Sequence, residues 1–223
     1  MPTAAATVES VNVVHAVIPD VLGDLDTTAI DKRPVPGRRA VDTLVGVAGD
    51  RIIDTKNHGG RDKAVYAYAR EDLDAWSREL GRALPGGTFG ENLTTYGVDL
   101  THAVIGDHWR VGSDGLVLEV ASPRIPCKTF QGWMDEPHWV KRFYAYGAPG
   151  AYLRVLSEGT VGSGDRIEVV HRPGHGVTIS DTFALRLTSA AVLERLLDEQ
   201  PDLEVTLAAA IRRDLAARAS TPG

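Results

Sequence analysis

The sequence predicts a mainly β protein with helices, in which short strands fold into a barrel or a folded sheet and a helical extension follows. Over the first three quarters of the chain, short apolar segments alternate with Gly, Pro and Asp, which is typical of strands joined by turns. The 23 Gly residues make tight corners easy to form. After residue 181 the apolar residues take helical spacing. The segments expected to form strands are residues 8–18, 41–47, 64–68, 109–111, 116–120, 152–156 and 167–170.

Two helices are expected to interrupt the β-rich part. Residues 71–80 carry acidic side chains in their first turn, and Gly81 follows as a stop signal. Within residues 137–146, three aromatic residues recur at the spacing of one helix face. Both segments therefore predict short helices between strands.

The C-terminal part of the chain predicts a helical extension. Residues 190–197 and 203–215 show helical spacing, with Pro201 at the break between them. We therefore predict a domain over residues 8–178 and an extension over residues 181–219. The extension would pack on the sheet or on a second subunit, as in a homodimer, and a partner-binding hairpin is the alternative. Its apolar stripe consists of Leu207, Ile211 and Leu215.

The composition limits the classes of function. The chain has 223 residues, is 43% hydrophobic and 24% charged, and carries a net charge of -6. Broad nucleic-acid binding usually requires a basic excess, so we expect no nucleic-acid partner. No apolar run reaches the roughly 20 residues of a membrane span, and no signal peptide is recognisable, so we expect a cytoplasmic protein without a membrane partner. The single cysteine, Cys127, excludes an intrachain disulfide and a cysteine-based metal cluster.

A run of glycines and cations precedes the strand expected at residues 64–68. It reads His58, Gly59, Gly60, Arg61, Asp62 and Lys63. Adjacent glycines let the backbone turn sharply and bring N–H groups close to a ligand. The cationic side chains suit a small anion such as phosphate. A tight turn with solvated charges explains the same run equally well.

A second glycine-rich run surrounds Phe89 and ends at Glu91 and Asn92. The Asn92 amide can both donate and accept hydrogen bonds, which suits a pterin-like heterocycle or a buried loop. A carboxylate is a poor neighbour for an anion, so we expect Glu91 to hold the loop in place. Arg154, which lies between apolar residues, is likewise expected to form an ion pair within the fold.

A rigid loop presents the single cysteine. Pro123 and Pro126 stiffen the backbone on either side of Arg124, and Cys127 follows. Positive neighbours favour a thiolate, which is a soft metal ligand or a nucleophile that can carry sulfur as a persulfide. An inert buried cysteine is the alternative.

Taken in order, these segments resemble the MOSC family, the domain found at the C-terminus of molybdenum cofactor sulfurases. The resemblance covers roughly residues 8–170 and is closest to the bacterial stand-alone members of the YiiM type, which share residues 29–35 and the helical extension. It implies a β-barrel of the pyruvate-kinase β-domain type. The matching motifs are Gly49-Asp50, His58-Gly59-Gly60 with Asp62-Lys63, Phe89-Gly90-Glu91-Asn92-Leu93, Gly106-Asp107, Pro123-Arg124-Ile125-Pro126-Cys127, Tyr152-Leu153-Arg154-Val155-Leu156 and Gly164-Asp165.

The resemblance also implies a cofactor and a reaction. Cys127 would be the catalytic residue and the ligand of molybdenum in a molybdenum cofactor (molybdopterin). The activity implied is that of an oxidoreductase that reduces N-hydroxylated compounds such as N-hydroxylated purine bases, a detoxification with a small-molecule substrate. A separate reductase would supply electrons. The residues that would line the cofactor pocket are His58, Gly59, Gly60, Lys63, Asn92 and Arg124.

Two alternatives remain at the level of the sequence. Cys127 would carry a persulfide in a sulfurtransferase that receives sulfur from a donor and delivers it to molybdoenzymes. In a pure binding module, Cys127 would stay passive.

For the oxidoreductase, we expect the substrate to reach the metal between the barrel mouth and residues 128–146. Aromatic residues there, namely Trp133, Trp139 and Tyr144, would stack on a flat base or pack in the core.

Overall fold

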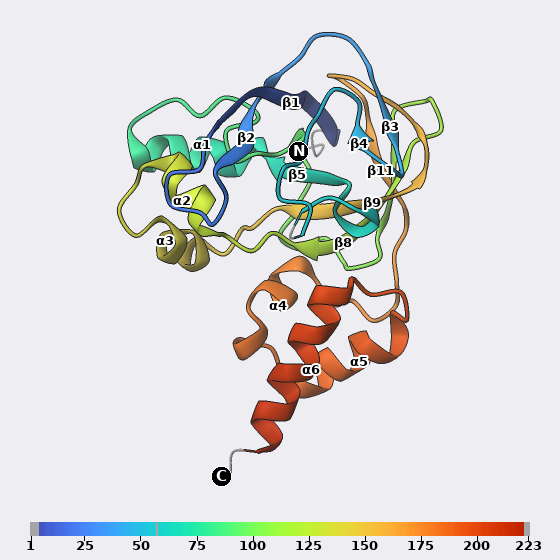
Figure 1. Ribbon diagram of the computed structural model, residues 1–223. Helices are drawn as coiled ribbons and strands as arrows, with labels where there is room; N and C mark the ends of the chain where they lie inside the picture. The colour runs from blue at the N-terminus through green and yellow to red at the C-terminus, as the bar shows by residue number, and fades with distance from the viewer. Residues whose placement is uncertain (1–4, 57, 221–223) are drawn as a thin grey trace.

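Strands and short helices alternate along the chain, and helices alone form its C-terminal part (Figure 1). The computed structural model describes residues 5–56 and 58–220. The first residues, where no signal peptide is expected, and Asn57, which precedes the glycine-rich run, lie outside this part. The strands are β1 (Thr7–Pro19), β2 (Thr27–Pro34), β3 (Arg39–Asp42), β4 (Gly46–Val47), β5 (Val65–Ala69), β6 (Leu93–Tyr96), β7 (His108–Val111), β8 (Val117–Pro123), β9 (Ala151–Ser157), β10 (Gly159–Val161) and β11 (Ile167–His171). The helices are η1 (Arg61–Lys63), α1 (Arg70–Leu80), α2 (Lys128–Met134), α3 (Trp139–Tyr146), α4 (Ile179–Phe183), η2 (Leu185–Leu187), α5 (Ala190–Glu199) and α6 (Val205–Ala219).

Most strands belong to one sheet. In the described part of the chain, this eight-stranded sheet has the order β11-β7-β8-β9-β5-β6-β1-β2, and β10-β3-β4 form a three-stranded sheet. β5 and β6 pair in parallel, with α1 in the crossover between them, as parallel neighbours require. The other pairs are antiparallel. A mainly β fold with helices is therefore confirmed.

The start of β1 brings the two ends of the sheet towards each other. Val8 N donates to Asp165 O at 2.8 Å, and Ile167 N donates to Ala6 O at 2.9 Å, so β1 contacts the chain that leads into β11. Only an isolated bridge, Thr7 with Arg166, joins the strands there. Within residues 5–56 and 58–220 no closed barrel is found, and the barrel remains a prediction.

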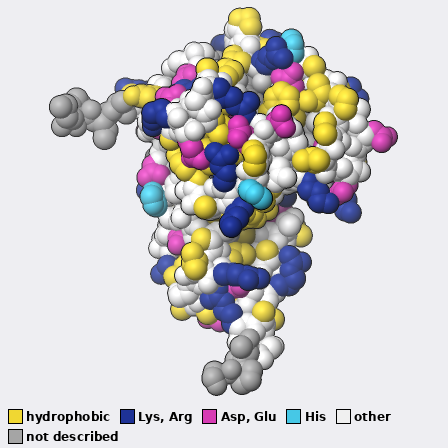
Figure 2. All heavy atoms as spheres, turned by 90° about the vertical axis from the view of Figure 1, so that its left-hand side faces the viewer, with side chains coloured by type: hydrophobic (Ala, Val, Ile, Leu, Met, Phe, Trp, Pro, Cys, Tyr) yellow, Lys and Arg dark blue, Asp and Glu magenta, His cyan; other side chains and the backbone are white. Residues whose placement is uncertain are grey.

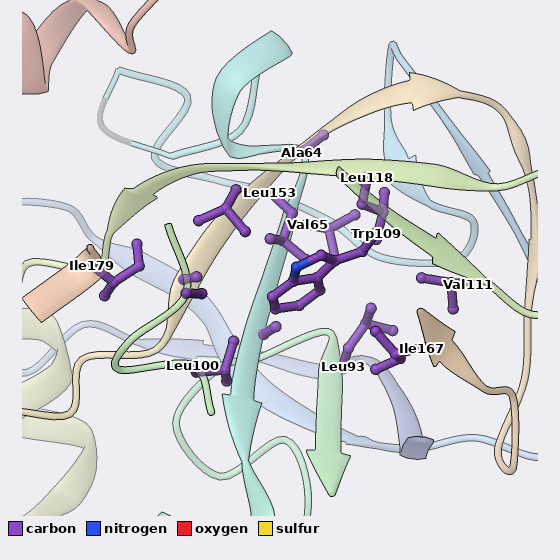
Figure 3. Packing of buried hydrophobic residues seen from close by; sticks show 14 of the residues in the cluster. Ala64, Val65, Leu93, Leu100, Trp109, Val111, Leu118, Leu153, Ile167 and Ile179 are labelled. Atoms are coloured by element: carbon purple, nitrogen blue, oxygen red, sulfur yellow. The ribbon is translucent and has the colours of Figure 1, made fainter. Parts of the chain in front are cut away.

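The main hydrophobic core lies against the large sheet. Trp109 of β7, which is 1% exposed, packs among Val65, Leu118 and Leu153 from β5, β8 and β9 (Figure 3). Apolar side chains of α5 and α6 belong to the same cluster of buried residues. The cluster therefore joins the sheet to the C-terminal helices.

A second core consists mainly of aromatic residues and joins α1, α2 and α3 to the sheet. Trp76 of α1 and Trp139 of α3 lie with ring centroids 4.6 Å apart, and Phe89 lies 5.1 Å from Phe130 of α2. These helices lie beside one end of the sheet in Figure 1. The aromatic contacts hold α2 in place, directly after the loop that carries Cys127.

The C-terminal helices α4, α5 and α6 form a group below the sheet in Figure 1. Helices are present where helical spacing predicts them, and Ile211 of α6 has no exposed surface. Because Leu207 and Ile211 belong to the main core, α6 packs on the sheet-bearing part of its own chain. The division into domains 8–178 and 181–219 remains a prediction. Every described helix is too short or too polar to span a bilayer.

Candidate functional site

The residues predicted to bind the cofactor lie together. A cavity of about 100 Å³, called the inner cavity here, lies at the ends of β2, β5 and β9, beside the loop before α2. Every predicted site residue except Gly60 lines it: His58, Gly59, Lys63, Asn92, Arg124 and Cys127. Residues far apart in the sequence are therefore brought to one place by the order of the strands.

Gly59 gives the run at residues 58–63 its shape. Its φ of 72° lies in the left-handed region, and a Cβ there would lie 2.6 Å from Cδ1 of Ile52. Both the backbone conformation and the close approach of Ile52 therefore require glycine. This turn places His58 and Lys63 at the cavity.

The other charged residues of the run face away from the inner cavity. Arg61 donates to Asp202 of the α5–α6 connection at 2.9 Å. Asp62 accepts from Arg154 at 2.8 Å, and Arg154 also contacts Glu119 at 2.8 Å and Asp202 at 3.0 Å. These contacts confirm the expected ion pair of Arg154 within the fold, and the side chain is only 2% exposed. Arg61 therefore links the glycine-rich run to the α5–α6 connection. It does not line the inner cavity, where the sequence predicts an anion site.

Arg124 is a buried cation with unused hydrogen-bonding capacity. The residue is 4% exposed, and its guanidinium lies 3.7 Å from the ring centroid of Phe130. Its Nη1 atom is buried and has no hydrogen-bond partner among the described residues. A buried, unsatisfied cationic donor is unfavourable, so this atom points to an anionic ligand.

His58 and Tyr152 form a hydrogen-bonded pair beside Arg124. The Nδ1 atom of His58 and the Tyr152 hydroxyl oxygen are 2.8 Å apart. Burial, with the positive charges of Arg124 and Lys63, lowers the pKa of His58 to about 4, and burial raises the pKa of Tyr152 to about 12. Both groups are therefore uncharged at neutral pH, and the His58 tautomer sets which of them donates the hydrogen bond.

Asn92 shapes the wall of the inner cavity. Its Nδ2 donates to Asp50 at 2.8 Å, and its Oδ1 accepts from the backbone N–H of Tyr66 at 3.1 Å. Asp50 in turn binds Lys32 at 2.6 Å and the backbone N–H of Val14 at 3.0 Å. The Asn92 amide is therefore engaged within the protein, and its contact with a cofactor remains a prediction.

Glu91 holds its loop, as the sequence predicts. Its carboxylate has no exposed surface and accepts from the backbone N–H groups of Gly87 and Phe89 at 2.6 and 2.9 Å. The hydroxyl of Thr94 also donates to it at 2.9 Å. These bonds fix the turn that leads into Asn92 and β6.

A larger cavity, called the outer cavity here, adjoins the inner one and measures about 790 Å³. It extends from the loop before α2 to α3 and the C-terminal helices. Figure 2 shows one face of the region where the sheet-bearing and helical parts meet, with Lys, Arg and His side chains gathered there. Cys127, which is partly exposed and stands at the N-terminus of α2, lines both cavities.

The aromatic residues expected beside the substrate lie elsewhere. Trp139 is fully buried in the aromatic core, and the Trp133 indole donates to the carbonyl of Thr88 at 2.7 Å. Tyr144 stacks on Phe183 with ring centroids 4.8 Å apart. Neither cavity is lined by these three side chains, so the stacking hypothesis is replaced by a packing role.

The inner cavity also has lining residues that sequence reasoning did not place there, among them Lys32 and Tyr152. Tyr152 stands opposite Tyr66 where β9 pairs with β5, so their alternating side chains share a face. Lys32 belongs to the segment 29–35 that supports the family resemblance, but its approach to Asp50 depends on long-range pairing.

The comparison with known proteins decides the family. The model of the MOSC domain family matches residues 54–168. The chain belongs to the MOSC domain family. This match contains most of the inner cavity, including His58, Arg124 and Cys127.

Several MOSC relatives are similar over about two thirds of this chain. The uncharacterized protein YflK of Bacillus subtilis is 36% identical over 68% of this chain and 69% of its own, and the protein YiiM of Escherichia coli is 30% identical over 71% and 70%. A fungal protein of Gibberella moniliformis named "Reductase" is 33% identical over 68% of this chain, but over only 27% of its own. Among solved structures, YiiM from Geobacillus stearothermophilus superimposes with a TM-score of 0.74 at 26% identity, covering 94% of this chain and 99% of that one.

Proposed function

We propose that this MOSC protein binds a molybdenum cofactor at the inner cavity and reduces N-hydroxylated compounds, with Cys127 as the metal ligand. The observation that carries the proposal is the buried Nη1 atom of Arg124, which has no partner among the described residues and lies in the same cavity as the Cys127 thiol. A cationic donor suits the phosphate of a pterin cofactor, and a thiolate suits a soft metal. MOSC domains are associated in general with molybdenum cofactor binding.

The chain's own residues fit such a cofactor. Arg124 and Lys63 would hold its anionic group, and the tight turn at Gly59 would let the backbone approach. Among the described residues no cluster of three or more His, Cys, Asp or Glu side chains could hold a metal. A metal bound to Cys127 would therefore take its remaining ligands from the cofactor.

The reaction requires electrons, protons and an exit for oxygen. Reduction of R–NHOH to R–NH₂ breaks the N–O bond, consumes two electrons and two protons, and releases the oxygen as water. The cofactor, when bound, supplies the two-electron chemistry, and a separate reductase would renew the electrons. The Tyr152 hydroxyl, which burial keeps protonated, would hold a proton next to His58.

A relative supports the reductive chemistry. The Gibberella moniliformis protein named "Reductase" matches this chain over 27% of its own length. Most of that polypeptide therefore lies outside the matched part, in keeping with an electron supply that is separate from the MOSC domain. We extend the proposal to detoxification of N-hydroxylated bases and to a cytoplasmic location, where the single thiol would stay reduced.

A sulfurtransferase is the second candidate, because Cys127 is partly exposed and lines the wide outer cavity. A persulfide on this thiol would be accessible to an acceptor. Cyanide-labile sulfur on Cys127 in metal-free protein would favour this function over the reductase.

The first test measures molybdenum per chain and N-hydroxylated purine reduction with an artificial electron donor. Wild type and Cys127→Ser are purified anaerobically from a host that makes the cofactor, and wild type from a host that lacks it is the control. We expect about one molybdenum per wild-type chain and reduction only by that sample, since serine is a poor soft-metal ligand. Metal-free, inactive wild type from the cofactor-making host would refute the reductase proposal.

A further inference from the structure

The outer cavity contains a buried hydroxyl that the proposed cofactor site does not use. Ser122, near the end of β8, is 3% exposed and lines this cavity. Its Oγ atom is buried and makes no hydrogen bond with any described residue. Such a group is unfavourable unless a ligand or water completes it. Ser122 pairs with Tyr152 in the β8–β9 register, so it lies close to the inner cavity as well.

Apolar residues from two parts of the chain line the outer cavity. Pro126 of the loop before α2 and Val140 of α3 belong to one part, and Leu207 and Ala210 of α6 belong to the other. The C-terminal helices therefore complete this cavity. A volume of about 790 Å³ lies within the range of small-molecule sites, about 300–1,000 Å³.

The start of α6 is anchored beside the glycine-rich run at residues 58–63. Glu204 accepts from the backbone N–H groups of Thr206 and Leu207 at 3.0 and 2.6 Å and lies 3.6 Å from Nζ of Lys63. These bonds fix the apolar wall of α6 relative to Lys63. The cavity wall is therefore held in a defined position.

The charges that line the outer cavity nearly balance. The carboxylates are those of Asp20, Asp24, Asp54 and Glu204, and the ammonium groups are those of Lys56, Lys63 and Lys128. A ligand of high net charge would gain little from such a lining. Apolar walls, balanced charges and one unpartnered hydroxyl instead suit a flat, uncharged heterocycle with a polar edge.

We propose that the outer cavity is the subsite for the heterocyclic ring of the substrate, between the Ser122–Lys128 loop and helix α6, with Ser122 as its hydrogen-bonding partner. This inference rests on the proposed reductase function, because Cys127 at the junction of the two cavities would then face the N-hydroxyl end of the same molecule. Ser122 donates to or accepts from the ring edge. The apolar side chains of α3 and α6 cover the ring faces.

The test uses molybdenum-loaded protein and two pairs of variants. Ser122→Ala removes the hydroxyl, and Ser113→Ala, at an exposed site away from both cavities, is its control. Ala210→Phe fills the cavity, and Ala216→Phe, on the exposed face of the same helix, is its control. The measurements are KM for an N-hydroxylated purine, KM for hydroxylamine, and the Kd of adenine by calorimetry.

We expect Ser122→Ala to raise the purine KM and the adenine Kd about fivefold to tenfold, as the loss of one neutral hydrogen bond would. Ala210→Phe should raise both by about tenfold or more through exclusion of the ring. The KM for hydroxylamine, which has no ring, and the molybdenum content should not change. The melting temperature of Ser122→Ala should not fall, because the substitution removes a buried hydroxyl that has no partner in the described part of the chain.

Failure of the subsite and failure of the function are distinguishable. If wild type is active but both variants keep the purine KM and adenine Kd of their controls, the subsite is wrong. If wild type is inactive, the reductase function fails, and adenine calorimetry still decides the subsite. Wild type that binds no adenine at millimolar concentration overturns it, whereas binding that both variants weaken supports it.

Discussion

Arg124 combines stacking and an unused donor in one buried side chain. Its guanidinium stacks on Phe130, yet Nη1 remains without a partner among the described residues. A buried charge that is incompletely paired destabilises a fold. The residue is therefore better explained by ligand binding than by stability.

Arg124→Met tests this explanation, because methionine keeps the apolar stem and removes the charge. We expect the variant to lose at least about tenfold in cofactor affinity, the scale of a lost charge-assisted hydrogen bond, and to keep or exceed the wild-type melting temperature. Molybdenum per chain and thermal unfolding are measured beside Arg110→Met, an exposed arginine paired with Glu168. Wild-type molybdenum content in Arg124→Met would contradict the assignment.

His58 makes the free energy of unfolding depend on pH. Its pKa is lowered to about 4 by burial and by neighbouring positive charges, whereas an unfolded histidine titrates near pH 6.5. The unfolded chain therefore binds this proton first, so stability is complete above pH 6.5 and is lost as the pH falls towards 4.

His58→Gln removes this titration and can still accept from Tyr152. Between pH 7 and pH 5, wild type should lose about 2 kcal/mol more unfolding free energy than His58→Gln, because a shift of this size is worth about 1.4 kcal/mol per pKa unit over the titrated range. Urea unfolding at both pH values measures the difference. Equal losses in the two proteins would show that His58 is not held neutral.

At the scale of elements, strand prediction succeeds where apolar residues recur along a segment and fails where polar residues predominate. β1, β5, β7, β8, β9 and β11 lie where the segments predict them, to within a few residues. The segment 41–47 forms two strands, because Asp42 accepts from the backbone N–H groups of Leu44 and Val45 and makes a turn. β2 is rich in Thr and charged residues, and two of the four residues of β6 are Thr, so these strands depend on their pairing with β1.

The candidate site was predictable in its members and less so in their roles. Motif positions identify the residues around the inner cavity, because the strand order brings them together. They do not reveal that Asn92 is engaged by Asp50 and Tyr66, or that Arg61 turns to Asp202. These contacts join residues far apart in the sequence, for which local patterns carry no signal.

The packing of α6 is tested by Ile211→Asp. Ile211 has no exposed surface and belongs to the main core, so a buried carboxylate there should cost about 3–5 kcal/mol of unfolding free energy. Ala216→Asp, on the exposed face of α6, is the control and should be near neutral. Urea unfolding and sedimentation are measured together. A stable variant that only changes its oligomeric state would place Ile211 at a subunit interface instead.

At the scale of the whole molecule, the C-terminal helices are integrated with the sheet by both packing and charge. The main core crosses from the sheet to α5 and α6, and Asp202 binds Arg61 and Arg154. Helical spacing predicts that these helices exist, but not that α6 lines the outer cavity. The position of α6 at the outer cavity depends on the ion pairs that Asp202 of the α5–α6 connection forms with Arg61 and Arg154.

The attachment of Arg154 has a consequence for the order of assembly. Its guanidinium joins Asp62 beside the glycine-rich turn, Glu119 of β8 and Asp202 of the α5–α6 connection. A ribosome delivers these segments in sequence, and Asp202 arrives last. The turn that carries Lys63 therefore gains its full set of ionic contacts only after residue 202 has been synthesised. Insertion of a cofactor at this turn is accordingly expected to follow synthesis of the α5–α6 connection.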